Sequence, residues 1–168
     1  MSQRVSERGD APRRVNGRRA TVVMMIVIVS ALAGTLKDAR AEVTADCEFL
    51  EISAKVGDKP AIDAELSPVE KKLKKPPFST WNQFKLLSRL QKPLAKKKAE
   101  PIPLKIGAAT ATLVEIVDKS KVRLTITMDD HKGKQVANNT ATVEAGDYLI
   151  YVHSLPNNEG HLLSLTCK

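Results

Sequence analysis

The sequence predicts an all-β (mainly β) domain, an antiparallel β-sandwich of seven to eight strands with one short helix. Two observations carry this prediction. The second half of the chain alternates apolar and polar residues between regularly spaced turns, and the only two cysteines lie near the two ends of the domain. Short strands at this spacing are typical of sandwiches and barrels. The expected likeness to immunoglobulin domains is one of general architecture alone.

The first 41 residues have the three parts of a cleavable export signal. Six arginines precede an uncharged and largely apolar run over residues 20–34, and Ala39-Arg40-Ala41 supplies the small residues that signal peptidase accepts. We therefore expect a signal peptide over residues 1–41, with cleavage after Ala41.

The alternative to cleavage is an anchor in the inner membrane formed by residues 20–36. This segment is short for a membrane-spanning helix, which needs about 20 apolar residues. In both cases the arginines stay in the cytoplasm. Residues 42–168 are therefore expected to form one exported domain, periplasmic or extracellular, of a length that suits a single core.

The basic character of the chain belongs mostly to its first 41 residues. They hold 8 of the 27 Lys and Arg residues and 3 of the 19 Asp and Glu residues, so residues 42–168 keep 19 and 16, a net charge of +3. Aromatic residues make up only 4% of the chain, too few for a surface that stacks on bases. We therefore expect no nucleic-acid partner.

Cys47 and Cys167 are the only cysteines, and both lie in the expected exported domain. In an oxidising compartment two cysteines most simply form a disulfide. That bond would place the first and last strands side by side or across the two sheets. In the chain-entropy model, closing so long a loop stabilises a fold by about 4–5 kcal/mol. A redox or metal-binding pair is not expected, because no C-x-x-C motif is present.

The first elements of the domain are a strand and a short helix. The strand is expected over residues 47–55. The helix is expected over residues 68–74, where Ser67 can cap it and Pro68 suits its first position.

The stretch after Pro76-Pro77 fits two interpretations. Phe78, Trp81 and Phe84 could share one helical turn, or the stretch could lead into a strand. We favour a strand over residues 82–91, because the following prolines suit a sheet edge.

The pattern is clearly β from residue 104 onward. Residues 121–128 alternate cleanly, so that Val122, Leu124, Ile126 and Met128 are expected to face the core. Before them, residues 96–103 form a loop or a protected sheet edge. The expected strands cover residues 110–117, 121–128, 135–144, 148–154 and 161–167.

Three stretches of the domain resemble a set of small exported bacterial proteins of unknown function. The shared residues are Glu51-Ile52-Ser53-Ala54, Ile62-Asp63 and the segment PPFSTWNQFKLL at residues 76–87. The resemblance would cover most of the domain. It implies an exported location and no particular activity.

Three histidines are the candidates for catalysis or metal binding. His153 and His161 flank one turn and would be neighbours across a hairpin, where Asp129 or Asp130 could join them; His131 lies on another turn. The sequence has no known metal-ligand spacing, no G-x-S-x-G motif and no glycine-rich phosphate loop. We therefore expect no catalytic residue, metal or cofactor. A small metal-dependent or hydrolytic enzyme using one of these histidines is the alternative.

Two lysine clusters are the best indication of a binding surface. Their members are Lys71, Lys72, Lys74 and Lys75, and Lys96, Lys97 and Lys98. If the clusters meet in space, they form a basic patch for an anionic envelope surface or an envelope protein. The alternative is a solvated face that protects a sheet edge. The favoured function is a non-enzymatic binding or structural module of the cell envelope.

Overall fold

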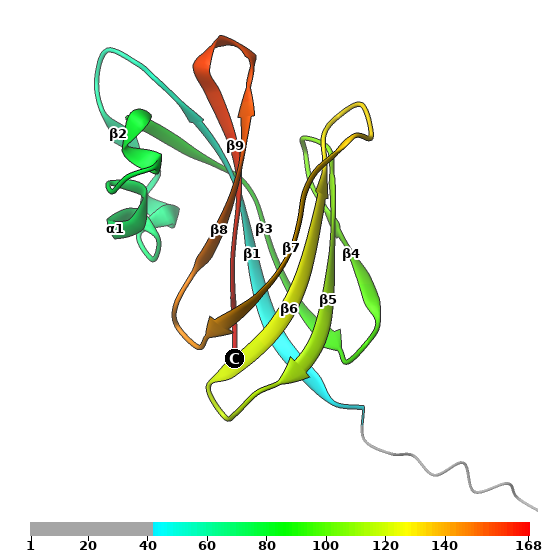
Figure 1. The fold of residues 1–168 in the computed structure, drawn as a ribbon. Coiled ribbons are helices and arrows are strands. Elements are labelled where there is room, and N and C mark those ends of the chain that lie inside the picture. The colour runs from blue at the N-terminus through cyan, green and yellow to red at the C-terminus, as the bar shows by residue number, and fades with distance from the viewer. Residues whose placement is uncertain (1–41) are drawn as a thin grey trace, which may run out of the picture. The chain divides into compact units, whose positions relative to one another are not determined.

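The computed structural model describes residues 42–168, which form two stacked sheets (Figure 1). The predicted export signal lies outside these residues. The strand order is β2-β3-β1-β9-β8 in sheet A and β4-β5-β6-β7 in sheet B. All pairs are antiparallel except the short pair of β2 with β3. The predicted β-sandwich is confirmed.

The part of the chain described here contains nine strands, slightly more than predicted. They are β1 Thr44–Lys55, β2 Ala61–Ile62, β3 Gln83–Ala95, β4 Ala99–Pro103, β5 Ala108–Ile116, β6 Lys121–Asp129, β7 Gln135–Glu144, β8 Leu149–Leu155 and β9 Glu159–Cys167. The one α-helix is α1 Glu70–Leu73, and 3-10 turns cover Ala64–Leu66, Phe78–Thr80 and Pro156–Asn158. Within residues 42–168, no helix has the length and apolarity needed to cross a membrane.

Sheet A is buried on both faces, because a separate apolar cluster packs against each. The inner cluster lies between the sheets and joins Phe49 and Leu163 of sheet A to β6 residues of sheet B. The four β6 residues expected to face the core, Val122, Leu124, Ile126 and Met128, are all buried there. The outer cluster joins Leu50 and Ile52 to the helical segment, residues 63–82, which packs on one end of the outer face of sheet A.

The helix is shorter than predicted, and its predicted cap is wrong. Val69 occupies the N-cap position without a side-chain hydrogen bond, while Ser67 ends the preceding 3-10 turn. Val69 and Leu73 are fully buried in the outer cluster. Apolar packing, rather than a polar cap, therefore positions this short helix.

The favoured strand after the helical segment is confirmed, but it extends to Ala95. Pro93 does not end it, because Pro93 lies opposite Asp46, whose backbone N–H and C=O both bond to Lys168. Pro93 therefore sits in a non-hydrogen-bonded pair and needs no N–H toward β1.

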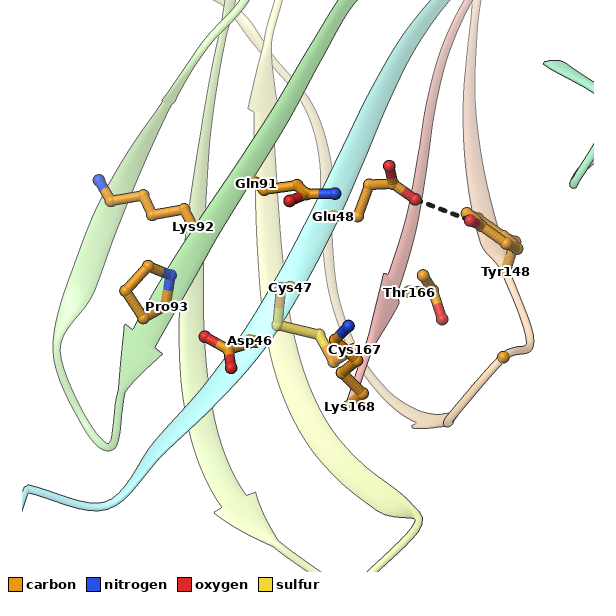
Figure 2. Close-up of a pocket in the computed structure, with 11 residues that line it drawn as sticks. Asp46, Cys47, Glu48, Gln91, Lys92, Pro93, Tyr148, Thr166, Cys167 and Lys168 are labelled. Carbon is orange, nitrogen blue, oxygen red and sulfur yellow. Dashed lines mark hydrogen bonds between the residues drawn. A yellow bond between two sulfur atoms is a disulfide. The ribbon is translucent and has the colours of Figure 1, made fainter. Parts of the chain in front are cut away.

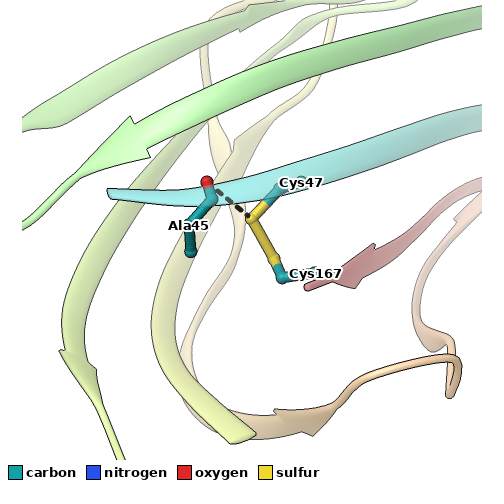
Figure 3. The surroundings of a disulfide bond; sticks show 3 residues. All are labelled: Ala45, Cys47 and Cys167. Atoms are coloured by element: carbon teal, nitrogen blue, oxygen red, sulfur yellow. Dashed lines mark hydrogen bonds between the residues drawn. A yellow bond between two sulfur atoms is a disulfide. The ribbon is translucent and has the colours of Figure 1, made fainter. Parts of the chain in front are cut away.

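The predicted disulfide joins Cys47 to Cys167, which lie directly opposite each other on β1 and β9 (Figures 2 and 3). The neighbouring pair, Asp46 and Lys168, exchanges both backbone hydrogen bonds. The cysteines therefore form a non-hydrogen-bonded pair, the kind in which antiparallel strands bring their Cα atoms closest. Their Cα atoms are 4.1 Å apart and their sequence separation is 120 residues. The bond fastens the first strand beside the last.

Replacing both cysteines, by Cys47→Ala and Cys167→Ala, is expected to lower the free energy of unfolding by about 2–5 kcal/mol, because the unfolded chain then loses its largest constraint. Denaturant unfolding of the oxidised protein and of the double variant measures the difference. A reducing agent should destabilise the natural chain and leave the variant unaffected. Equal stability of all samples, or two titratable thiols in the natural chain, would contradict this assignment.

Candidate functional site

The structure brings two of the three candidate histidines together and places the third on another turn. His153 and His161 are cross-strand partners on β8 and β9, as expected, but His131 lies in the turn between β6 and β7. Asp130 closes that turn, because its carboxylate accepts the backbone N–H groups of Lys132 and Lys134. Within residues 42–168, no three His, Cys, Asp or Glu side chains gather as metal ligands would.

One of these histidines, His161, binds a buried carboxylate that sequence analysis missed. Glu51 is 1% exposed and projects from β1 on the same side as Cys47 and Phe49, into the sandwich. His161 Nε2 lies 3.0 Å from Glu51 Oε1. Ser88 of β3 donates its hydroxyl to Oε2 at 2.7 Å.

Two backbone N–H groups from sheet B complete the Glu51 site. Lys105 donates to Oε2 at 2.8 Å and Ile106 donates to Oε1 at 2.9 Å. Both belong to the loop between β4 and β5, so the carboxylate joins the two sheets. Four donors around one buried carboxylate make a satisfied structural anchor.

The same contacts argue against a hydrolytic site at His161. In a nucleophilic triad the histidine accepts a proton from the hydroxyl, and the carboxylate orients the histidine. Here Ser88 bonds to Glu51 instead of His161, and the carboxylate lies between the hydroxyl and the imidazole. The arrangement therefore does not activate Ser88 as a nucleophile.

Hydrogen bonding holds Glu51 ionised despite its burial. Burial alone raises the pKa of this carboxyl. The hydrogen bonds from His161, Lys105, Ser88 and Ile106 outweigh that effect and lower the pKa from its ordinary value of 4.5 to about 2. Because the carboxylate stays charged, it accepts all four hydrogen bonds over the whole neutral range.

The two lysine clusters do not form one basic patch. Lys71, Lys72, Lys74 and Lys75 belong to the helical segment before β3, whereas Lys96, Lys97 and Lys98 form the turn after β3. In the fold, the helical segment and the turn from β3 to β4 lie well apart (Figure 1).

Several of these lysines are also engaged in local contacts. Lys74 pairs with Glu70, and Lys98 pairs with Glu100. Lys72 donates to the backbone oxygen of Tyr148 at 2.5 Å and pairs with Asp147 at 2.6 Å. Lys72 thus fastens the turn between β7 and β8 to the helical segment.

A groove of about 470 Å³ opens on the outer face of sheet A, beside the disulfide (Figure 2). Its floor is formed by three adjacent strands, β1, β3 and β9, at the end that the helical segment leaves uncovered. The lining residues are Asp46, Cys47, Glu48, Gln91, Lys92, Pro93, Gly146, Tyr148, Thr166, Cys167 and Lys168. This volume is in the range of ligand-binding clefts.

A hydrogen-bonded group forms one wall of the groove. Tyr148 donates its hydroxyl to Glu48 Oε2 at 2.8 Å (Figure 2), and Arg89 Nε lies 3.5 Å from Glu48 Oε1. Burial and the hydrogen bond to the Glu48 carboxylate together raise the pKa of Tyr148 to about 12. Tyr148 therefore stays a neutral donor at physiological pH.

Thr166 of β9 lines the groove and carries a buried hydroxyl. Its Oγ1 atom has no hydrogen-bond partner among the described residues. Buried hydroxyls ordinarily have a partner, so this one is an exception, and because its oxygen is covered it does not present a bonding group at the surface of the groove.

Sequence analysis missed Glu51, Glu48 and Tyr148. For Glu51 a signal was present, because a charged residue follows Cys47 and Phe49 on the inward side of an alternating strand. For the groove no local signal exists, since its residues are brought together from four separate segments of the chain.

No known protein family, curated protein or solved structure matches this chain.

The substitution Glu51→Gln is expected to destabilise the fold by about 3 kcal/mol at neutral pH, because an amide cannot accept all four bonds. The difference should depend on pH. The pKa of Glu51 falls from 4.5 to about 2 on folding, so its contribution is complete above pH 4.5 and is lost as the pH falls toward 2. Denaturant unfolding between pH 7 and pH 2 measures it.

Glu100→Gln is the matched control for this prediction. The pKa of Glu100 is also lowered to about 2, by hydrogen bonds from Lys92 and Lys98. Its pair with Lys92 connects β4 to β3, but both lysine side chains are partly exposed to solvent, where an ion pair stabilises a fold little. A penalty for Glu51→Gln that is as small as that of Glu100→Gln, or that does not change with pH, would contradict the assigned role.

Proposed function

We propose that this protein is an exported, non-enzymatic binding module of the cell envelope, and that it binds a polar segment of an envelope protein in the groove on sheet A. The observation that carries the proposal is the groove itself, a cleft lined by side-chain donors and acceptors.

The chemistry of the groove favours binding over catalysis. The lining combines carboxylates at Asp46 and Glu48, an amide at Gln91 and an ammonium at Lys168. These groups match the mixed donors and acceptors of a polypeptide segment. The Glu48–Tyr148 pair is held by Arg89 and by the Lys72 contacts to the turn, so the wall is positioned before a ligand arrives.

The disulfide supports the exported location in this proposal. Disulfides persist in proteins that mature in oxidising compartments and are rare in the cytosol. The bond between Cys47 and Cys167 borders the groove, so the same cross-link that stabilises the domain also holds two strands of the groove floor in register.

A photocrosslinking amino acid at Gln91, in the groove, is expected to capture an envelope protein in the producing cells, while the same amino acid at Thr112 should not. Thr112 lies on β5 of sheet B and faces away from the inner cluster. The measurement is the mass of crosslinked products after purification of this protein.

Two further variants test which surface is responsible. Tyr148→Phe removes the donor to Glu48 and should reduce the Gln91 crosslink several-fold. The combined substitution of Lys96, Lys97 and Lys98 by Glu should leave it unchanged, because these lysines lie in the turn after β3, outside the groove. No product from Gln91, equal products from both positions, or loss of binding only in the lysine variant would overturn the groove as the binding site.

A further inference from the structure

The outer edge of β7 is a free strand edge that lies outside the groove. β7 ends sheet B, and none of residues 42–168 pairs with its second edge. From residue 135 to residue 143 the strand has no charged residue and no proline. Proteins ordinarily protect a long free edge with lysine, proline or bulges, because its unpaired N–H and C=O groups accept another strand.

The remaining edges of the two described sheets are better protected or shorter. β4 contains Pro101 and Pro103. The free edge of β3 carries Lys85, Arg89 and Pro93, and β2 covers its beginning. β8 is uncharged but shorter, at 7 residues against 10 for β7.

Along β7, the backbone N–H and C=O groups of every second residue point outward, away from β6. At one end Ala145 donates its N–H to Ser120, and at the other Asp130 donates its N–H to Lys134. Hydrogen-bonded and non-bonded pairs alternate along an antiparallel ladder, and the register shifts once, between Met128 and Asp129. The odd-numbered residues from 137 to 143 therefore use their backbone groups on β6.

The even-numbered residues consequently have free backbone N–H and C=O groups. These residues are Asn138, Thr140, Thr142 and Glu144, except that the C=O of Glu144 already accepts the backbone N–H of Asp147 at 2.9 Å, which leaves only its N–H free. Their side chains lie on the outer face of sheet B, opposite the inner cluster, and all four are exposed. The edge is therefore accessible and regular over this stretch.

We propose that β7 pairs with β7 of a second copy of this chain, antiparallel, about a two-fold axis through Ala141. This register places Thr140 opposite Thr142 of the partner subunit, and Asn138 opposite Glu144 of the partner subunit. The free outward backbone groups of residues 140, 142 and 144 then pair, with about six interchain hydrogen bonds in total. The two four-stranded sheets become one continuous sheet.

The composition of the edge favours a second copy as the occupant. The self-paired register brings no like charges together, and the one charged residue, Glu144, lies opposite an amide that can donate to it. Threonines already hydrogen-bond across this sheet, since the hydroxyls of Thr125 and Thr140 are 2.7 Å apart. A two-fold pairing also closes on itself, because each copy uses the same edge.

Sedimentation of the protein purified after export tests the pairing. At tens of micromolar the natural chain should have twice the monomer mass. Thr140→Pro removes an outward N–H without touching the bonds to β6, and should weaken the dimer at least about tenfold.

Val152→Pro is the matched control on the other uncharged edge, β8. Val152 lies opposite Leu162, which pairs on its other side with Ile52 of β1. Hydrogen-bonded and non-hydrogen-bonded pairs alternate along β1 and β9, starting from the bonded pair of Asp46 and Lys168, so Leu162 bonds to β1 through its backbone groups. The backbone N–H of Val152 therefore points outward, away from β9. This variant should dimerise like the natural chain, and circular dichroism should confirm that both variants are folded.

Engineered cysteines test the register independently. Ala141→Cys places two thiols at the axis in a non-hydrogen-bonded pair, the arrangement that Cys47 and Cys167 already use. It should form a covalent dimer on oxidation. Ala137→Cys lies on the same face of the same strand but about 27 Å from its copy across the axis, and should stay monomeric on a non-reducing gel.

Several results would overturn the proposal. They are a monomeric natural chain up to hundreds of micromolar, a dimer that Thr140→Pro does not weaken, or crosslinking of Ala137→Cys as efficient as that of Ala141→Cys. A monomeric natural chain would leave the edge to a strand of a different protein. Because the groove is tested by crosslinking from Gln91 on the other sheet, that result would not affect the proposed function.

Discussion

The ionised carboxylate of Glu51 is the constraint on which the arrangement of the two sheets depends. A charge inside a sandwich is tolerated only if it is fully hydrogen-bonded. Its donors come from β3, from β9 and from the loop between β4 and β5. Those elements must therefore converge at one point. The loop is shaped for this approach by Gly107, whose positive φ and contact with the backbone of Asp129 exclude a side chain.

The uneven cover on the outer face of sheet A explains where the groove lies. The helical segment covers one end of the outer face through Leu66, Val69 and Leu73. The groove occupies the part of that face which it leaves open. Lys72 connects the two regions, because it reaches from α1 to the turn that carries Tyr148. A lysine first considered as part of a basic patch thus positions a wall of the groove.

The sequence predicted the features that local pattern controls and missed those that depend on tertiary convergence. Alternation identified the buried face of β6, and the two cysteines identified neighbouring strands. The Ser67 cap was wrong because buried Val69 and Leu73, rather than a local hydrogen bond, position the helix. The sequence could not show whether the two lysine clusters meet, because this depends on how the 13 residues of β3 between them are placed in the fold. The groove could not be predicted from the sequence, because its residues come from distant segments of the chain.

The two sheets are stabilised by different means, which bears on the free edge of β7. Sheet A has the disulfide and both apolar clusters. Sheet B has the inner cluster, the loop held by Glu51 and the contacts of Lys92 and Lys97 to β4 and β5, and none of these reaches its β7 residues Asn138, Asn139 and Thr140, which are exposed. Pairing β7 with a second copy adds backbone hydrogen bonds to the sheet with fewer constraints. Self-association would therefore stabilise the part of the sandwich that the covalent cross-link does not reach.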